Sequence, residues 1–224
     1  MKLQIREKWR HVKLQIVIFF EKFLFDVLNG TDTHVEVQKI AYAEKPDSLN
    51  NGTYYSASYT TELKKSFRIV RELLGEELAE YKFVDVGCGK GKAVIAWKLL
   101  CLRNKINQPV MGFDYSESLI RIARTNYRKV LKEEGHLVVA DAVTFNYAEI
   151  GEKLIIYLFN PFDEVIFQKF LDSIKTLKTI IIYNNPNHQQ IVVQNGWTEF
   201  HCGNGILGFN RTVMSARNIT DISH

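Results

Sequence analysis

The sequence contains little cysteine: three residues, Cys88, Cys101 and Cys202, among 224. They lie far apart, form no Cys-x-x-Cys pair and have no metal-ligand spacing to the six histidines. A disulfide framework and a zinc site are therefore not expected. We predict no metal and a reducing, cytoplasmic location.

Long apolar runs and a strong charge of one sign are also absent. The run Ile16 to Phe20 follows several basic residues, but Glu21, Lys22 and Asp26 interrupt it and no small-residue cleavage site follows. We predict neither a signal peptide nor a membrane span. The net charge of +4, without a dense basic stripe, does not favour nucleic acid as a partner.

Apolar residues recur at helical spacing from about Lys8 to Leu28, and Asn29-Gly30 supplies a stop. This pattern predicts an amphipathic helix. The favoured interpretation packs it on the domain beside a ligand cleft; the alternative is peripheral contact with a membrane or a partner. The polar stretch Thr31 to Ser58 is predicted to be a loop, because it carries several turn signals.

Strands and helices alternate after a helix that we expect to start with Thr60 or Thr61 as its cap and to end near Leu74. Strands are expected at 83–86, 110–114, 137–141, 154–159 and 179–183, and helices at 90–102, 118–131, 165–171 and 188–194. This order indicates an α/β fold with a doubly wound, mostly parallel sheet. Two last strands, 197–202 and 206–214, flank Gly203-Asn204-Gly205, which favours a tight antiparallel hairpin and gives seven strands.

The first predicted strand runs into Asp85-Val86-Gly87-Cys88-Gly89-Lys90-Gly91, with three alternate glycines before a helix. Glycine permits positive φ and close approach of a ligand, and a helix N-terminus offers unpaired N–H groups. Lys90 is expected to be solvated. The pattern resembles motif I of class I S-adenosylmethionine-dependent methyltransferases, in which an acid precedes Gly-x-Gly-x-Gly. An ordinary glycine-rich turn is the alternative.

A nicotinamide-binding fingerprint fits less well, because its third glycine comes one residue later and an apolar residue stands in the place of Asp85. Two further predicted strands end in acids, Asp114 and Asp141. The resemblance implies that Asp114 accepts both ribose hydroxyls and that Asp141, with the next backbone amide, addresses the adenine of S-adenosyl-L-methionine. Alternatively, Asp114 caps the next helix and Asp141 is satisfied by its own turn.

The cofactor residues implied by the resemblance are Asp85, Gly87, Cys88, Gly89, Gly91, Asp114, Tyr115, Asp141, Ala142 and Asn160. The fourth long strand ends in Asn160-Pro161-Phe162, which resembles the Asn-Pro-Pro-aromatic motif of amino-directed methyltransferases with one proline missing. The resemblance implies a catalytic role in which Asn160 and the Pro161 carbonyl orient an acceptor on which Phe162 stacks. A turn that merely ends the strand is the alternative.

Three tyrosines before the core domain, Tyr54, Tyr55 and Tyr59, are predicted to bind substrate, with core packing an equal alternative. We divide the chain into a helical extension with a Tyr-rich loop (1–60), a methyltransferase domain (61–215) and a flexible tail (216–224). The resemblance implies methyl transfer, with a protein or small-molecule amine ranked first as acceptor and a glycan or lipid-linked hydroxyl second. A cofactor-binding but inactive interaction module is the rival function, and a nicotinamide oxidoreductase is disfavoured.

Overall fold

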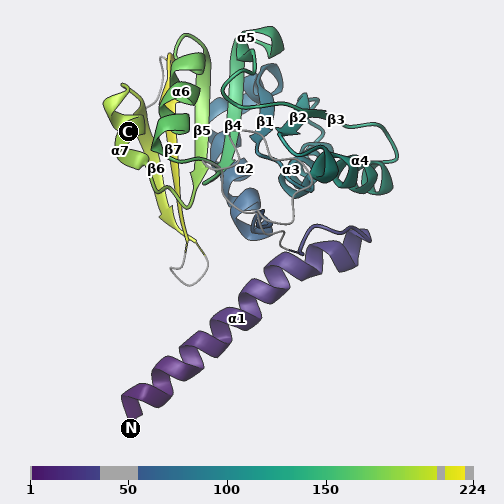
Figure 1. Cartoon of the computed structure of the whole chain (residues 1–224), viewed down its shortest axis with the longest axis vertical. Helices are drawn as coiled ribbons and strands as arrows, with labels where there is room; N and C mark the ends of the chain where they lie inside the picture. Colours follow the sequence, from purple (N-terminus) through teal and green to yellow (C-terminus); the bar gives the residue numbers. More distant parts are fainter. Residues whose placement is uncertain (1, 36–54, 206–209, 220–224) are drawn as a thin grey trace.

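The computed structural model describes residues 2–35, 55–205 and 210–219. A seven-stranded sheet in the order β3-β2-β1-β4-β5-β7-β6 lies between two layers of helices, and α1 projects away from this domain (Figure 1). The strands are β1 Lys82–Val86, β2 Val110–Asp114, β3 His136–Val139, β4 Lys153–Phe159, β5 Lys178–Asn184, β6 Thr198–Asn204 and β7 Arg211–Arg217. The helices are α1 Lys2–Asn29, α2 Thr60–Leu74, η3 Gly75–Glu80, α3 Lys92–Arg103, α4 Glu117–Leu131, α5 Tyr147–Ile150, α6 Glu164–Ile174 and α7 Gln189–Gln194.

The first five strands pair in parallel, and β7 pairs antiparallel with both β5 and β6. The predicted doubly wound α/β fold with seven strands and an antiparallel end is therefore confirmed. The glycine-containing stretch before β7 is not the tight turn that we expected, because Gly203 and Asn204 are paired inside β6, opposite Thr212 and Arg211. The last predicted strand, 206–214, begins at Arg211 in the structure, and its residues 206–209 lie outside the described residues.

Two apolar clusters fill the space on either side of the sheet. Residues 154–158 of β4 have no exposed surface, as expected for a strand covered on both faces. On the side of α2, α3 and α4, the Trp97 ring stacks on Phe83 with centroids 4.2 Å apart. On the other side, Phe167 and Phe170 of α6 pack against β4 and β5. This two-sided core fixes the edge at which the parallel strands end.

The long helix α1 contacts the domain mainly through its C-terminal third. It begins before the predicted start, and it ends at Asn29 because Gly30 adopts a φ of +65°. The N-terminus of α2 is capped by α1 and not by its own threonines: the Glu21 carboxylate accepts hydrogen bonds from the N–H (3.0 Å) and the hydroxyl of Thr61. Packing on the domain is thus right for this end of α1 and wrong for most of its length. Within the described residues, no helix is long and apolar enough to cross a membrane.

Candidate functional site

The turn between β1 and α3 lies at the carboxyl edge of the sheet, beside the C-terminal end of α1 (Figure 1). Its three glycines have φ values of +74°, +51° and +83°, which L side chains rarely adopt. The Phe113 carbonyl in β2 accepts the N–H groups of Gly87 and Cys88 at 3.0 and 2.9 Å. These hydrogen bonds therefore fix the turn to the neighbouring strand β2 at the carboxyl edge of the sheet.

Each of these glycines has a different neighbour. A Cβ on Gly87 would lie 3.2 Å from Pro161, so this glycine brings the turn against the end of β4. A Cβ on Gly91 would lie 3.1 Å from Ala123, so this glycine lets α3 approach α4. The buried Cys88 side chain packs under Gly112, where burial raises the pKa of its thiol. Gly91 and Cys88 thus have packing roles that the motif alone does not reveal.

Asp114, at the end of β2, holds the glycine turn and the start of α4 together. One carboxylate oxygen accepts the Gly89 N–H and the other accepts the Ser116 N–H, both at 2.9 Å. The helix cap is Ser116, whose hydroxyl accepts the Leu119 N–H at 3.3 Å. These contacts place Asp114 at the tip of β2 beside the glycine turn, where the resemblance implies an acid that accepts the ribose hydroxyls; that role stays a prediction.

Asp85, the acid that precedes the glycines, is 4% exposed. Burial raises the pKa of its carboxyl group well above the usual value, and the nearby negative charge of Asp114 raises it further. Burial disfavours the ionised form of such a carboxyl group, and a nearby cation favours it. This position therefore suits the positively charged amino-acid end of the implied cofactor.

Tyr55 covers the glycine turn. An ideal Cβ on Gly89 would lie 2.1 Å from the Tyr55 ring, so this glycine is required by an aromatic side chain of the same protein. The Tyr55 hydroxyl donates to the Thr33 carbonyl at 2.6 Å, and its ring belongs to an apolar cluster with Leu119 and Tyr115. Tyr55 thus joins the segment before α2 to the candidate site.

The other two tyrosines differ in what the structure says of them. Tyr59 lies at the start of α2, with its ring edge-on to Phe159 at the end of β4 and 5.9 Å between centroids. It therefore borders the strand from which the predicted acceptor motif follows. Tyr54 lies outside the described residues.

Two lysines anchor the N-terminal segment: Lys90 in the glycine turn and Lys92 at the start of α3. Lys90 is 3% exposed and pairs with Asp32 at 3.1 Å, so the expectation that it is solvated is wrong. Lys92 donates to the Glu21 carbonyl of α1 at 2.8 Å, and burial lowers the pKa of its amine to about 8. The side-chain amide of Asn126 in α4 accepts the Asp32 N–H and donates to the Asp32 carbonyl, both at 3.1 Å. The sequence alone could not predict these contacts, because the two residues of each pair are far apart along the chain.

Asp26 near the end of α1 organises the chain that leads to this contact. It accepts hydrogen bonds from Thr31, Thr33 and His34, including two backbone N–H groups at 2.7 Å. Burial alone would raise its pKa, but these hydrogen bonds outweigh burial and lower it. Sequence reasoning missed this residue. The polar pattern Asp-x4-Thr-x-Thr-His around the helix end was its only signal.

Asp141 lies two residues beyond the end of β3, so the strand stops earlier than predicted. Its carboxylate accepts the Val143 N–H at 2.8 Å, as in the alternative in which the turn satisfies it. It also lines a cavity of about 440 Å³ whose walls include Met111, Val138 and Phe145. Ala142 is buried beside it. Asp141 is therefore held by its turn and still faces open space.

Asn160 follows β4 with a φ of +45°, in the left-handed region, and its side-chain oxygen accepts the Tyr183 hydroxyl at 3.3 Å. Pro161 lies against Gly87, as described above. Phe162 is half-buried with its ring 5.8 Å from that of Phe170. The structure thus brings the ends of β1, β2 and β4 together with Tyr55 and Tyr59, whereas Asp141 lies further along the edge.

The chain was compared with families, curated proteins and solved structures. A family model described as a methyltransferase domain matches residues 78–196. No curated protein matches. Among solved structures, a Nostoc punctiforme PCC 73102 protein provisionally named an O-methyltransferase is 14% identical with a TM-score of 0.53, over 89% of this chain and 69% of that one.

The pyocyanin biosynthetic protein PhzM is 17% identical with a TM-score of 0.50, over 67% of this chain. The match spans 54% of the PhzM chain. At these identities the likeness concerns the fold alone. The family match covers more than half of the chain, in the segment that contains β1, the glycine turn, Asp114 and the end of β4. The chain therefore belongs to the methyltransferase domain family and is an S-adenosylmethionine-dependent methyltransferase.

Proposed function

We propose that this enzyme transfers the methyl group to an amine of a protein or small molecule, and that Asn160, Pro161 and Phe162 position that amine. The observation that carries the proposal is the left-handed turn at Asn160, directly against the glycine turn through the Pro161–Gly87 contact. Non-glycine residues in this conformation are uncommon and are often found at functional positions. The predicted acceptor motif at residues 160–162 and the predicted cofactor motif at residues 85–91 are therefore in direct contact.

The cofactor would be held by residues of three strand ends. Asp114 would accept the ribose hydroxyls, Asp85 would compensate the amino-acid cation, and Asp141 with the Ala142 N–H would face the adenine. Gly87 and Gly89 would let the backbone lie close to the ligand, with Tyr115 beside it. The fit rests on the place of Asp114 at the tip of β2, against the glycine turn, and on the raised pKa of Asp85, which a cation would lower.

S-adenosylmethionine supplies an activated methyl group on a good leaving group, so the protein needs mainly to orient and desolvate the acceptor. In our proposal the Asn160 side-chain oxygen and the Pro161 carbonyl accept hydrogen bonds from the amine, so that its lone pair points at the methyl carbon. The new N–C bond forms as the S–C bond breaks. The product ammonium then loses one proton to water.

The Tyr183 hydroxyl supports the role of Asn160, because its hydrogen bond holds the amide in one orientation with the oxygen at the edge. Phe162 and Tyr59 would form the aromatic walls around the acceptor, and Tyr55 would close the cofactor side. Aromatic faces also favour a developing positive charge. An amine acceptor uses all of these groups, whereas a hydroxyl acceptor would call for a general base to remove its proton.

The test measures methyl transfer from radiolabelled cofactor to panels of amine and hydroxyl acceptors. We expect label on amines only, with a rate that rises with pH until the acceptor amine is neutral. Asn160→Ala should lower kcat at least about 100-fold, the effect of losing an orienting group. Asn185→Ala is the matched control, because Asn185 also has a positive φ, of +51°, at the end of the neighbouring strand. Label on hydroxyls alone, or equal losses in the two variants, would refute the proposal.

A further inference from the structure

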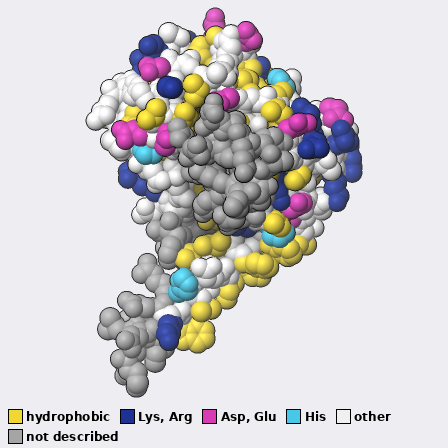
Figure 2. Space-filling view, in the orientation of Figure 1, with side chains coloured by type: hydrophobic (Ala, Val, Ile, Leu, Met, Phe, Trp, Pro, Cys, Tyr) yellow, Lys and Arg dark blue, Asp and Glu magenta, His cyan; other side chains and the backbone are white. Residues whose placement is uncertain are grey.

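The outer face of α1 is apolar and exposed. Trp9, Val12, Ile16, Phe19, Phe20 and Val27 are each between 47% and 63% exposed. Neighbouring members of this set are one, three, four or seven residues apart, and at 100° of rotation per residue all six fall on one side of the helix. Figure 2 shows hydrophobic side chains in a row along this helix. We call these six residues the α1 stripe.

Leu14 and Phe25, which are 3% and 7% exposed, lie on the side of α1 opposite the stripe, and near Phe25 the Glu21 carbonyl meets Lys92. Asp26, seven residues after Phe19, lies at the edge of the stripe and is buried by the segment 31–34. The stripe is therefore not an unused core face of this domain, because the domain side of the helix is already defined. Contiguous exposed apolar patches often mark interaction surfaces.

Positive charge borders the stripe. Lys8 and Lys13 are exposed and stand on opposite flanks of it, given 100° of rotation per residue. No acidic residue occurs between residues 8 and 20, and the first 13 residues contain five lysines and arginines against one glutamate. Lysines at such positions can keep their ammonium groups in water beside an apolar phase. Two copies of this face would bring like charges together, which disfavours self-association.

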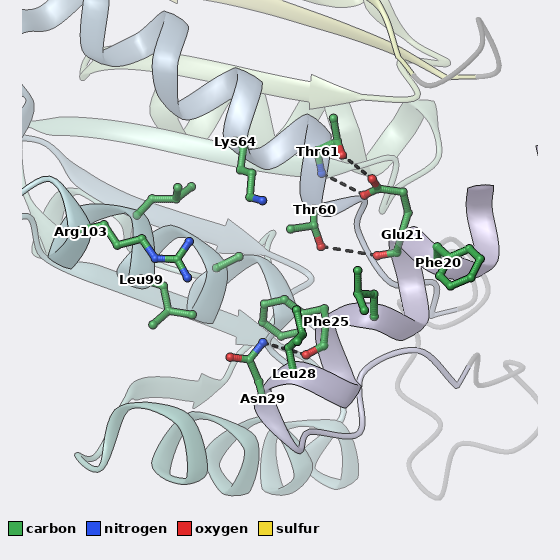
Figure 3. Close-up of a pocket in the computed structure, with 13 residues that line it drawn as sticks. Phe20, Glu21, Phe25, Leu28, Asn29, Thr60, Thr61, Lys64, Leu99 and Arg103 are labelled. Carbon is green, nitrogen blue, oxygen red and sulfur yellow. Dashed lines mark hydrogen bonds between the residues drawn. The ribbon is translucent and has the colours of Figure 1, made fainter. Parts of the chain in front are cut away.

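A cavity of about 160 Å³ continues this surface between α1, α2 and α3. Figure 3 shows Lys64 from α2 and Arg103 from α3 pointing toward the space beside Phe25 and Leu28. Glu21 is the acid among the residues that line it, and its carboxylate is engaged by Thr61. The cavity therefore combines apolar walls with two cations, which suits an anionic headgroup above an acyl chain.

We propose that α1 docks this protein on an anionic lipid surface, with the stripe in the interface and Lys64 and Arg103 against lipid headgroups. A helix that lies in the interface needs one apolar face, basic residues and aromatic anchors, and it does not need to span the bilayer. At 28 residues, α1 has about 42 Å of length for this contact. Docking would hold the carboxyl edge of the sheet near the lipid surface.

Tryptophan fluorescence of the full chain tests the proposal, because Trp9 is 63% exposed whereas Trp97 and Trp197 are buried. The probes are vesicles of phosphatidylcholine with or without 30% phosphatidylglycerol. We expect a shift of the emission to shorter wavelength on the mixed vesicles, with at least tenfold stronger binding than on phosphatidylcholine alone. Trp9→Phe should abolish the shift while the protein still sediments with the vesicles.

Two pairs of substitutions separate the apolar and charged parts. Ile16→Gln with Phe19→Gln should weaken binding at least tenfold, whereas Val165→Gln with Val193→Gln, equally exposed on α6 and α7, should change it less than twofold. Lys64→Glu with Arg103→Glu should remove most of the preference for phosphatidylglycerol. Arg121→Glu with Lys169→Glu is the control for net charge.

Several results would overturn the proposal. These are no binding to the mixed vesicles, equal losses in the test and control pairs, or a dimer in sedimentation velocity that Ile16→Gln with Phe19→Gln dissociates while vesicles do not bind. Binding of an acidic protein without vesicle binding would also overturn it. None of these readouts involves methyl transfer, so the proposed acceptor is tested separately.

Discussion

The carboxyl edge of the sheet and the outer face of α1 break the ordinary rules of burial in opposite ways. At the edge, ionisable side chains are buried: Lys90 is paired with Asp32 within the protein, whereas burial raises the pKa of Asp85, whose charge a bound cation would compensate. On α1, large apolar side chains are exposed over most of the helix. Buried charge is costly unless it is paired or serves a ligand, and exposed apolar surface is costly unless something covers it. Each region therefore indicates a binding partner, but of a different chemical kind.

The two regions are joined by a short polar segment. Asp26 fixes residues 31–34, Asp32 pairs with Lys90, and Tyr55 reaches from the Thr33 carbonyl to the glycine turn. A change in this segment should therefore affect both regions, whereas a change in either region alone should remain local. The predictions that follow use this difference.

The largest effect on stability is expected from Asp26→Asn. An amide has one acceptor oxygen and cannot replace the carboxylate that several donors share. We expect about 3 kcal/mol less local stability, measured as about 100-fold faster amide hydrogen exchange in residues 26–34. Asp163→Asn is the control, because asparagine is as good a helix cap as aspartate, and exchange at the start of α6 should change little. Unchanged exchange at 26–34 would remove Asp26 from its anchoring role.

Asp85→Asn should have effects of opposite sign on stability and cofactor binding. The folded-state pKa of Asp85 is raised, so the native protein holds a proton that the unfolded chain releases near pH 4. Asp85 therefore lowers stability as pH rises above that value, and the asparagine variant should melt a few degrees higher at pH 7. This gain should vanish at pH 3.

The same substitution should weaken S-adenosylmethionine binding roughly tenfold, because one unit of pKa shift corresponds to about that factor. In the parent protein, binding of the cationic ligand should release a proton, and affinity should fall as pH falls. Calorimetry in buffers of different ionisation enthalpy measures this release. If the variant binds as tightly and releases the same proton, Asp85 does not pair with the cofactor.

The smallest effect is expected from Ile16→Gln with Phe19→Gln on the isolated protein. Both side chains are about half exposed, so the free energy of unfolding should change by less than about 0.5 kcal/mol. Cofactor affinity should stay within twofold. A loss of 2 kcal/mol in urea unfolding would mean that the stripe packs on the protein itself, and the contrast between the two regions would disappear.

Sequence reasoning succeeded where local chemistry determines the structure. Alternating strands and helices, the glycines with positive φ and the acid at the tip of β2 are each specified by nearby residues, and the sheet followed from them. The same local signals did not show that Gly89 accommodates Tyr55 or that Gly91 accommodates Ala123. Those requirements come from residues more than 30 positions away.

The N-terminal contacts could not be predicted for the same reason. A lysine in a turn is usually solvated. No residue near Lys90 in the sequence predicts its ion pair with Asp32, which lies 58 positions earlier. Likewise, the sequence correctly predicted that α1 ends at Asn29-Gly30. It could not predict which side of α1 faces the domain, because that depends on contacts with Lys92 and Thr61. Helical periodicity identifies an apolar face and does not say what covers it.

The central claim is that the edge formed by β1 and β2 binds S-adenosylmethionine. Its most direct test is calorimetric titration with S-adenosylmethionine, S-adenosylhomocysteine and NAD, on the parent protein and on Gly89→Arg and Asp114→Ala. We predict binding of both adenosyl ligands and not of NAD, and a loss of affinity of at least about 100-fold in each variant. Asp114→Ala removes a carboxylate that makes charge-assisted hydrogen bonds, and the side chain of Gly89→Arg would clash with the Tyr55 ring. Binding of NAD alone, or full affinity for S-adenosylmethionine in both variants, would contradict the account.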